Sequence, residues 1–463
     1  MSNTPENICA LSLTQLSKAI HSREITSQAA TEAIFQRIDE KDSQINAYVH
    51  LFREAALRQA QQADQEIAQN QSRGPLHGVP VAIKDMIDTI EGPTTMASPI
   101  YKDHVAGRNA TVVDRLDQAG AILIGKLNMH QFAFGAMGDR SLEDPARNPH
   151  DLSKITGGSS SGSGAAVAAD MAFATIGTDT GGSIRIPASC CGIVGMKPTF
   201  GTVSKYGVFP LSWTQDHIGP MTKTVADNAT FLNVLAAHDP KDPYSLRRPE
   251  EDFGALIGQA VTGLKVGVPE NYFFDIMEPE VQKIFDRNVK VLQDQGVEIV
   301  PIQLPLMDEL MAANQMILAS DAYAVLGEHV VNQPENFDPE VLTRILSGAG
   351  VYASQYVRML AAKNQIIEAH AKVMASLDAV ITPTLCVLPF DIDQRQIDVQ
   401  GVMHQARVIV RMTVPANLTG FPAISVPGGR VGALPVGIQM MGLPYTEGKL
   451  YQLAAALEAA TDA

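Results

Sequence analysis

Cysteine is scarce in this sequence, long apolar runs are missing, and basic residues are never clustered. The four cysteines show no CxxC spacing, which excludes a disulfide framework and a zinc ribbon and leads us to expect reduced thiols. The chain has no unbroken apolar run of about twenty residues, so no membrane span is expected. Residues 1–10 lack the basic start and apolar core of a signal peptide. These absences predict a soluble, cytoplasmic protein.

Basic residues are also fewer than acidic ones, 35 Lys and Arg against 50 Asp and Glu. The net charge is −15, with no Lys/Arg cluster to offset it, so a polyanion would approach against an unfavourable field. We therefore expect no nucleic acid and no membrane among the partners, while a homodimer stays open. None of the eleven histidines recurs at metal-ligand spacing, so no metal is expected. We also expect no cofactor.

An apolar fraction of 45% and a charged fraction of 18% are typical of a globular protein. Short apolar runs alternate with helical patterns along the chain, which predicts an α/β fold with a large sheet covered by helices on both faces. No linker or repeat forces a division, so we expect residues 1–463 to form one domain. Strands are expected at 79–83, 121–125, 265–268, 297–300, 379–381, 423–426 and 436–440.

Helices are expected at both ends and in the middle of the chain. The N-terminal helices are expected within about 10–70. A capping-box spacing predicts that the first begins at Ser12. The second is expected at 27–39, and a third, exposed helix at 55–70. Further helices are expected at 111–118, 281–293 and 446–460. The segment of about 306–372 is mostly helical by pattern, and its many Met, Ala and Tyr residues suit either core packing or a wall of the substrate pocket.

Residues 154–198 carry the strongest chemical signal. They contain TGGSSSGSG at 156–164 and TDTGGSIRIP at 178–187, so paired glycines stand beside serines twice. Glycine allows positive φ and close backbone approach, and peptide N–H groups can then converge on an anion. A serine there can attack a carbonyl while the N–H groups stabilise the oxyanion. This pattern indicates acyl transfer.

The chain resembles the amidase signature family of serine hydrolases over most of its length. The resemblance rests on GVPVAIKD at 78–85, GKLNM at 125–129, the glycine/serine stretch, CGIVGMKPT at 191–199, DHIGP at 216–220 and PANLTG at 415–420. The intervals of 75 residues from Lys84 to Ser159 and of 24 from Ser159 to Ser183 are also family-like. The resemblance implies the amidase signature fold and hydrolysis of a small-molecule carboxylic amide to acid plus ammonia or amine.

The resemblance further implies a Ser–Ser–Lys triad. Ser183 is the expected nucleophile, Ser159 the bridging serine on a cis peptide bond, and Lys84 the base. A lysine acts as a base only when its surroundings have lowered its pKa, so Lys84 must be neutral at rest. A proton then passes from Ser183 through Ser159 to Lys84, and returns to the leaving nitrogen.

By the same likeness, the oxyanion hole consists of the backbone N–H groups of Thr180, Gly181, Gly182 and Ser183. Supporting roles around the loop and the triad fall to Ser160, Asp179 and Arg185. For Asp179 and Arg185 a plain structural ion pair is an equal alternative.

Simpler interpretations exist for the other candidates. Taken alone, Lys84 could be an exposed lysine at a strand end. Ser159 and Ser183 could belong to a flexible Gly/Ser linker, although order-promoting residues flank the glycine pair beside Ser183. Cys190 and Cys191 lie near the expected nucleophile in the sequence, and we interpret them as buried residues that pack in the core. A phosphate-binding module is the weakest alternative, because no Gly-Lys-Ser/Thr follows the glycines.

Within the family, the nearest members are bacterial amidases and the glutamine-hydrolysing amidase component of the tRNA-dependent glutamyl-/aspartyl-tRNA amidotransferase. In that component an acidic residue shortly before the segment resembling 413–417 helps hold glutamine, and Val410 aligns with it here. This departure favours a plain amidase. Arg407 and Arg411 are candidates for binding a substrate carboxylate, or else are solvent-exposed surface residues. Met129 is a third candidate for substrate binding.

Overall fold

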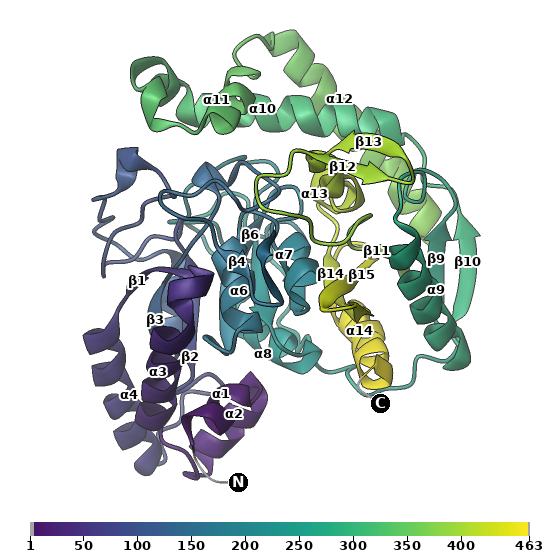
Figure 1. Cartoon of the computed structure of the whole chain (residues 1–463). Coiled ribbons are helices and arrows are strands. Elements are labelled where there is room, and N and C mark those ends of the chain that lie inside the picture. Colours follow the sequence, from purple (N-terminus) through teal and green to yellow (C-terminus); the bar gives the residue numbers. More distant parts are fainter. Residues whose placement is uncertain (1–3, 462–463) are drawn as a thin grey trace.

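A computed structural model describes residues 4–461, and its centre is one mixed sheet of eleven strands (Figure 1). In spatial order the strands are β1 (Tyr48–Leu51), β3 (Ile122–Leu127), β2 (Pro80–Lys84), β6 (Ala174–Asp179), β8 (His217–Thr222), β7 (Val194–Lys197), β14 (Ala423–Val431), β15 (Leu434–Met441), β11 (Ala379–Pro383), β9 (Lys265–Pro269) and β10 (Glu298–Ile302). Since this sheet joins residues from 48 to 441, it connects almost the whole chain.

Parallel pairing is confined to two parts of the sheet. β3, β2 and β6 run parallel at one side and β11, β9 and β10 at the other, while the strands between them pair antiparallel. β2 lies between two parallel neighbours and is buried along its whole length. Because parallel strands end at the same sheet edge, the last residues of β2 and β6 lie close together.

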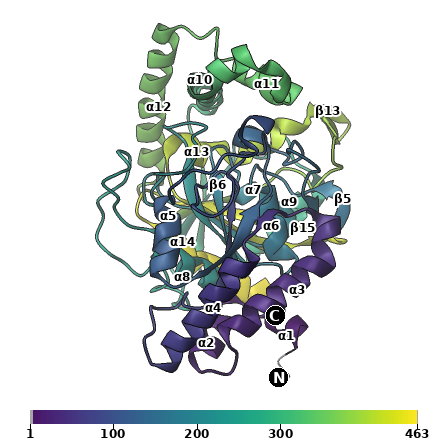
Figure 2. The ribbon, with the colours of Figure 1, turned by 90° about the vertical axis from the view of Figure 1, so that its left-hand side faces the viewer.

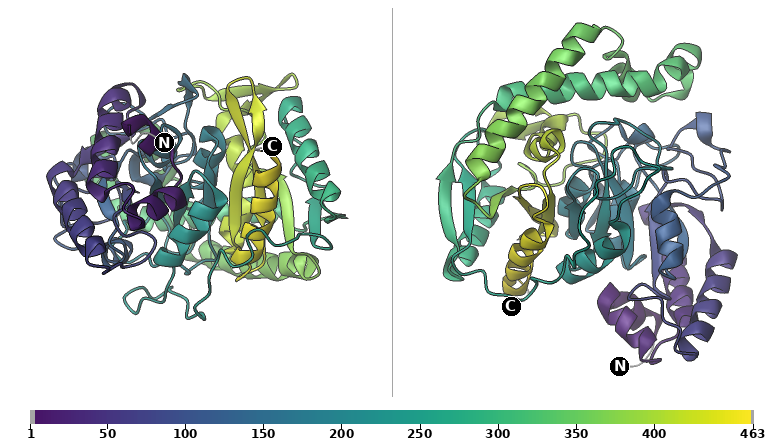
Figure 3. Two further views of the ribbon diagram at one scale, coloured as in Figure 1. Left: turned by 90° about the horizontal axis from the view of Figure 1, so that it is seen from below. Right: turned by 180° about the vertical axis from the view of Figure 1, so that it is seen from behind.

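Helices pack on both faces of the sheet, as Figures 1 and 3 show, which confirms the predicted α/β class. Besides the N-terminal and middle helices described below, they are α5 (Thr111–Gln118), α6 (Ser161–Ala168), α7 (Arg185–Cys191), α8 (Val225–Leu235), α9 (Pro279–Asp294), α13 (Val414–Thr419) and α14 (Glu447–Thr461). Two short hairpins complete the fold: β4 (Arg147–Asn148) with β5 (Asp151–Ile155), and β12 (Gln396–Val399) with β13 (Val402–Gln405). The 3-10 turns are η1 (Pro99–Tyr101), η2 (Gln131–Ala133), η3 (Pro334–Asn336) and η4 (Ala406–Met412).

The N-terminal helices lie together beside the β1 end of the sheet (Figure 1): α1 (Pro5–Ala10), α2 (Leu13–His21), α3 (Ser27–Ile45) and α4 (Arg53–Ala68). The capping box predicted at Ser12 is present, with reciprocal hydrogen bonds to Gln15. α3 is longer than the predicted 27–39, and α4 is less exposed than predicted. Ala56, Ala60 and Ala63 form a buried stripe on α4, because their small side chains allow close packing.

The middle helices form a separate layer above the sheet: α10 (Met307–Asn332), α11 (Pro339–Leu346) and α12 (Ala353–Met374). Figure 2 shows α12 projecting along one side of this layer. On α10, Asp321 accepts hydrogen bonds from Ser212 and Thr214 below and from Tyr356 on α12. The layer is therefore tied to the loop before β8, while its role as a pocket wall stays a prediction.

Among residues 4–461, no helix is long and apolar enough to cross a membrane. The four cysteines are free and buried.

Candidate active site

Lys84 is the last residue of β2, and its side chain is fully buried. Its Nζ lies 2.7 Å from Ser159 Oγ and 2.7 Å from Thr178 Oγ1. Burial lowers the pKa of Lys84 to about 7, although the charges of Asp216 and Asp179 act in the opposite direction. Around neutral pH a large share of the amine is therefore uncharged and can accept a proton.

Ser159 stands on the turn between β5 and α6. Gly157 and Gly158 have φ of 75° and 63°, in the left-handed region that favours glycine. A Cβ on Gly158 would lie 2.6 Å from Pro187 Cδ and 3.1 Å from Ser183 Cα, so only glycine allows the two serine loops to approach this closely.

The peptide bonds of residues 4–461 are all trans, so the cis bond that the family resemblance implied at Ser159 is absent from this structure. For a residue other than proline, trans is the lower-energy form by about 2.5–4 kcal/mol.

Ser183 lies between β6 and α7, and it is buried together with Ser159. The backbone N–H of Ser159 donates to Ser183 Oγ over 3.0 Å. Within the described residues no hydrogen bond joins the two hydroxyl groups directly. The three predicted triad residues thus converge, with Lys84 contacting the Ser159 side chain and Ser183 contacting its backbone.

A buried ion pair holds the loop that carries Ser183. Arg185 Nε and Asp179 Oδ2 are 3.0 Å apart, and both side chains are fully buried. Burial opposes ionisation of Asp179, but the Arg185 charge together with the hydrogen bonds from Arg185 and Asn417 holds the pKa of this carboxyl well below its ordinary range. Asn417 joins both side chains at 2.7 Å, so α13 contributes to the same network.

The Asp179 carboxylate also accepts hydrogen bonds from the backbone. Gly182 N–H donates to Oδ1 over 2.7 Å and Ile184 N–H donates to Oδ2 over 3.2 Å. Gly182 N–H is consequently engaged, whereas the N–H groups of Thr180, Gly181 and Ser183 have no acceptor within the described residues. These three remain available to a substrate oxygen.

Sequence reasoning missed several residues that shape the site. Thr178 contacts Lys84, Asp216 accepts from the Thr180 hydroxyl over 2.6 Å, and Thr413 donates its hydroxyl to Gly181 O over 2.6 Å. The Ser160 hydroxyl donates to Thr178 O and accepts from Thr178 N–H, and the supporting role predicted for it stays a prediction. The DHIGP and PANLTG motifs pointed to the segments of Asp216 and Asn417, but not to these contacts.

The residues predicted to bind substrate have different surroundings, and their role stays a prediction. Arg411 stacks on Tyr272, with its guanidinium carbon 3.8 Å from the ring centre, and pairs with Asp275 at 3.1 Å. Arg407 is exposed on η4, and Met129 is fully buried in the core. Arg411 already has its charge partner, which leaves it poorly suited to grip a substrate carboxylate.

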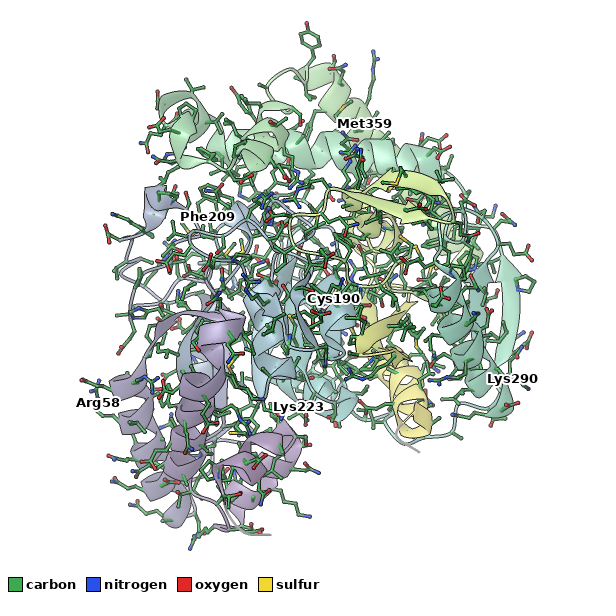
Figure 4. The ribbon with its side chains drawn as sticks, viewed as in Figure 1. Arg58, Cys190, Phe209, Lys223, Lys290 and Met359 are labelled. Carbon is green, nitrogen blue, oxygen red and sulfur yellow. The ribbon has the colours of Figure 1, made fainter. Side chains whose placement is uncertain are left out.

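The two cysteines near the nucleophile are packed in the interior. Cys190 lies on α7 near the middle of the molecule in Figure 4. Burial raises the pKa of the Cys190 thiol to about 12, so it stays protonated and unreactive. Within residues 4–461, no three His, Cys, Asp or Glu side chains are grouped so that they could hold a metal ion.

Known proteins share both the sequence and the fold of this chain. The amidase family model matches residues 29–451. The chain is 40% identical to a glutamyl-tRNA(Gln) amidotransferase subunit of Chloroflexus aggregans, over 96% of this chain and 95% of the relative. It is 38% identical to the protein of the same name from Carboxydothermus hydrogenoformans, over 98% and 97%.

A solved structure of a vestigial protein complex, described as revealing the evolutionary origins of an s-triazine catabolic enzyme, has a TM-score of 0.93 to this chain. The two are 30% identical, and the match covers 97% of this chain and 98% of the other. The fold and the family resemblance expected from the sequence are thus confirmed.

One expectation is contradicted by these relatives. We expected no nucleic acid among the partners, yet the names of the curated relatives include a tRNA and describe one subunit of a larger enzyme. The physical reason for the error is that the charge of one chain describes only its own surface. It does not report what an assembled enzyme acts on.

Proposed function

The chain belongs to the amidase signature family and is a hydrolase of amide C–N bonds, and on this premise we propose that it cleaves carboxylic amides through an ester on Ser183. Ser183 Oγ attacks the amide carbonyl and its proton passes by way of Ser159 to Lys84. As the tetrahedral intermediate collapses, the C–N bond breaks and the proton returns to the departing nitrogen. Water then hydrolyses the ester by the same proton path.

The observation that carries this proposal is the buried contact of 2.7 Å between Lys84 Nζ and Ser159 Oγ. A buried lysine without a carboxylate partner favours its neutral form, and the hydroxyl beside it has a proton to give. The relay also needs the Ser159 and Ser183 hydroxyls to meet. Catalytic hydrogen bonds often tighten only once substrate is bound, and Ser183 Oγ already lies 3.0 Å from Ser159 N.

The oxyanion is held, in this proposal, by the free N–H groups of Thr180, Gly181 and Ser183. The sequence led us to expect Gly182 as well, but its N–H bonds the Asp179 carboxylate instead. Asp179 then acts by fixing the loop, so the donors point at the substrate without reorganising during the reaction. Loss of one such donor typically costs about 2.7–4 kcal/mol of barrier.

The test is release of ammonia or amine from a panel of primary amides, anilides, amino-acid amides and ureas. Ser183→Ala and Lys84→Ala should each lose nearly all turnover while remaining folded. Ser161→Ala is the matched control, because the buried Ser161 hydroxyl has no hydrogen-bond partner within the described residues. Full turnover by Ser183→Ala would refute the proposal.

A second candidate is the glutamine-hydrolysing component of a tRNA-dependent amidotransferase, and the amidotransferase relatives at 38–40% identity favour it. Against it stands Val410, which offers glutamine no carboxylate; its carbonyl instead accepts from Thr413. Ammonia release from glutamine that depends on an added partner protein would support this candidate. Hydrolysis of other amides with no ammonia release from glutamine, even after the partner protein is added, would exclude it.

We further propose that the protein is cytoplasmic and forms one domain. Four buried free cysteines suit a reducing compartment. The eleven-stranded sheet, which joins strands from both ends of the chain, supports one domain.

A further inference from the structure

Lys84 has a second partner that the proposed mechanism does not yet use. Thr178 Oγ1 lies 2.7 Å from Lys84 Nζ, on the side chain of a residue in the neighbouring parallel strand β6. The Thr178 hydroxyl also lies 3.3 Å from Met86 Sδ, within reach of a hydrogen bond to sulfur. All three side chains are buried, with exposed fractions of 0% for Lys84, 3% for Thr178 and 2% for Met86.

The backbone fixes this group of three residues. Met86 follows Lys84 in a tight turn, where its N–H donates to Lys84 O over 2.9 Å. Thr178 is held on the opposite side by Ser160, whose Oγ donates to Thr178 O and accepts from Thr178 N–H, both over 3.1 Å. The positions of the amine, hydroxyl and sulfur are therefore set by two adjacent strand ends.

The numbers of hydrogens and lone pairs limit how the Lys84 amine and the Thr178 hydroxyl can hydrogen-bond. A neutral lysine amine has two N–H donors and one lone pair, and a threonine hydroxyl has one hydrogen and two lone pairs. If Thr178 donated its hydrogen to the amine, it would occupy the lone pair. Ser159 could then only accept a hydrogen bond from Lys84, and its own proton would have no base to receive it.

We propose that Met86 Sδ takes the hydroxyl hydrogen of Thr178, so that Thr178 accepts an N–H from Lys84 and leaves the lysine lone pair directed at the Ser159 hydroxyl. Met86 and Thr178 are thus positioning residues for the base. This inference rests on the proposed function, because it assigns Lys84 the role of proton acceptor. It adds that the orientation of the amine, and not only its charge state, is set by the protein.

Met86→Leu tests the proposal with little change in volume, since Leu and Met exchange at small cost in cores. Without the sulfur, the Thr178 hydroxyl turns to the lysine lone pair. A positioned base contributes about 10²–10⁴-fold to rate, so partial loss of its orientation should lower kcat by about tenfold. KM should stay the same. The acidic limb of the pH profile should move to lower pH, because the new hydrogen bond favours the neutral amine.

Met171→Leu is the matched control, since Met171 is equally buried but outside the site. It should keep the wild-type kcat and pH profile. Thr178→Val removes the hydroxyl, and adding Met86→Leu to it should then change nothing further.

Two results would overturn the inference. One is an unchanged kcat and acidic limb in Met86→Leu. The other is an equal loss from Met86→Leu with and without the Thr178 hydroxyl, which would mark a packing effect. Failure of the proposed function itself looks different, because Lys84→Ala would then retain turnover.

Discussion

Lys84 illustrates how burial alone can prepare a side chain for chemistry. Its two hydrogen-bond partners are hydroxyls, and the nearest carboxylates act only at a distance. Near neutral pH the Lys84 amine therefore exchanges readily between its neutral and protonated forms, and it is not held permanently as an ammonium ion. The resemblance to the amidase signature family predicted that Lys84, Ser159 and Ser183 meet, whereas Lys84 taken alone suited an exposed strand end.

The pH dependence of turnover follows from this amine. The base works only when neutral, and the neutral fraction rises as pH increases through the pKa of about 7. We expect kcat/KM to fall steadily below about pH 7 and to level off above about pH 8, measured with one amide from pH 5 to 9. A flat profile over that range would contradict a lysine base.

The Asp179–Arg185 pair makes a prediction about stability. Asp179→Asn would leave Arg185 buried without its countercharge, which typically costs about 3–5 kcal/mol. Urea unfolding should show a loss of this size. Asp39→Asn is the control, because the Asp39 side chain in its ion pair with Arg53 is 63% exposed and should contribute no more than about 1 kcal/mol. Similar losses from both variants would contradict this view of the loop.

The residues that were not predicted share one property. Thr178, Asp216 and Asn417 act through contacts with segments distant in sequence, such as the 238 positions that separate Asn417 from Asp179. No local pattern reports such a contact. The contact of Arg411 with Asp275 was not predicted for the same reason, since the two residues lie 136 positions apart.

At the scale of helices and strands, the sequence predicted an element correctly where a local pattern, such as a capping box, was chemically specific. The helix start at Ser12 and the helix at 111–118 agree with α2 and α5. Four strands of the large sheet, β1, β6, β7 and β8, were not predicted. β8 contains Gly219 and Pro220, which have low strand propensity, and it is a strand because it pairs with β6 and β7 inside the sheet.

The capping box of α2 gives a prediction at this scale. Ser12→Ala removes the hydroxyl that accepts from Gln15 N–H over 3.2 Å, and N-cap losses of this kind cost about 1 kcal/mol. Thermal unfolding should register it. Ser22→Ala, at the exposed C-terminal end of the same helix, should stay within about 0.5 kcal/mol of wild type. Equal effects would mean that the cap does not stabilise the helix.

At the scale of the whole molecule, the sheet explains why the site could be anticipated but not its substrate. Lys84 and the Ser183 loop come from the adjacent parallel strands β2 and β6, and the motifs of the family resemblance pointed to both segments although β6 itself was not predicted. Segments distant in sequence also contact the Ser183 loop, such as those of Asp216 and Thr413, and no periodicity brings them together. The net charge of −15 led us to expect no nucleic acid among the partners, which the name of a relative, containing a tRNA, contradicts.

The central claim, that Ser183 is the nucleophile, is tested most directly by intact-protein mass spectrometry after reaction with an organophosphonate or sulfonyl fluoride. We predict one covalent adduct on the wild-type chain, none on Ser183→Ala, and normal labelling of Ser161→Ala. Equal labelling of the wild type and Ser183→Ala would contradict the account.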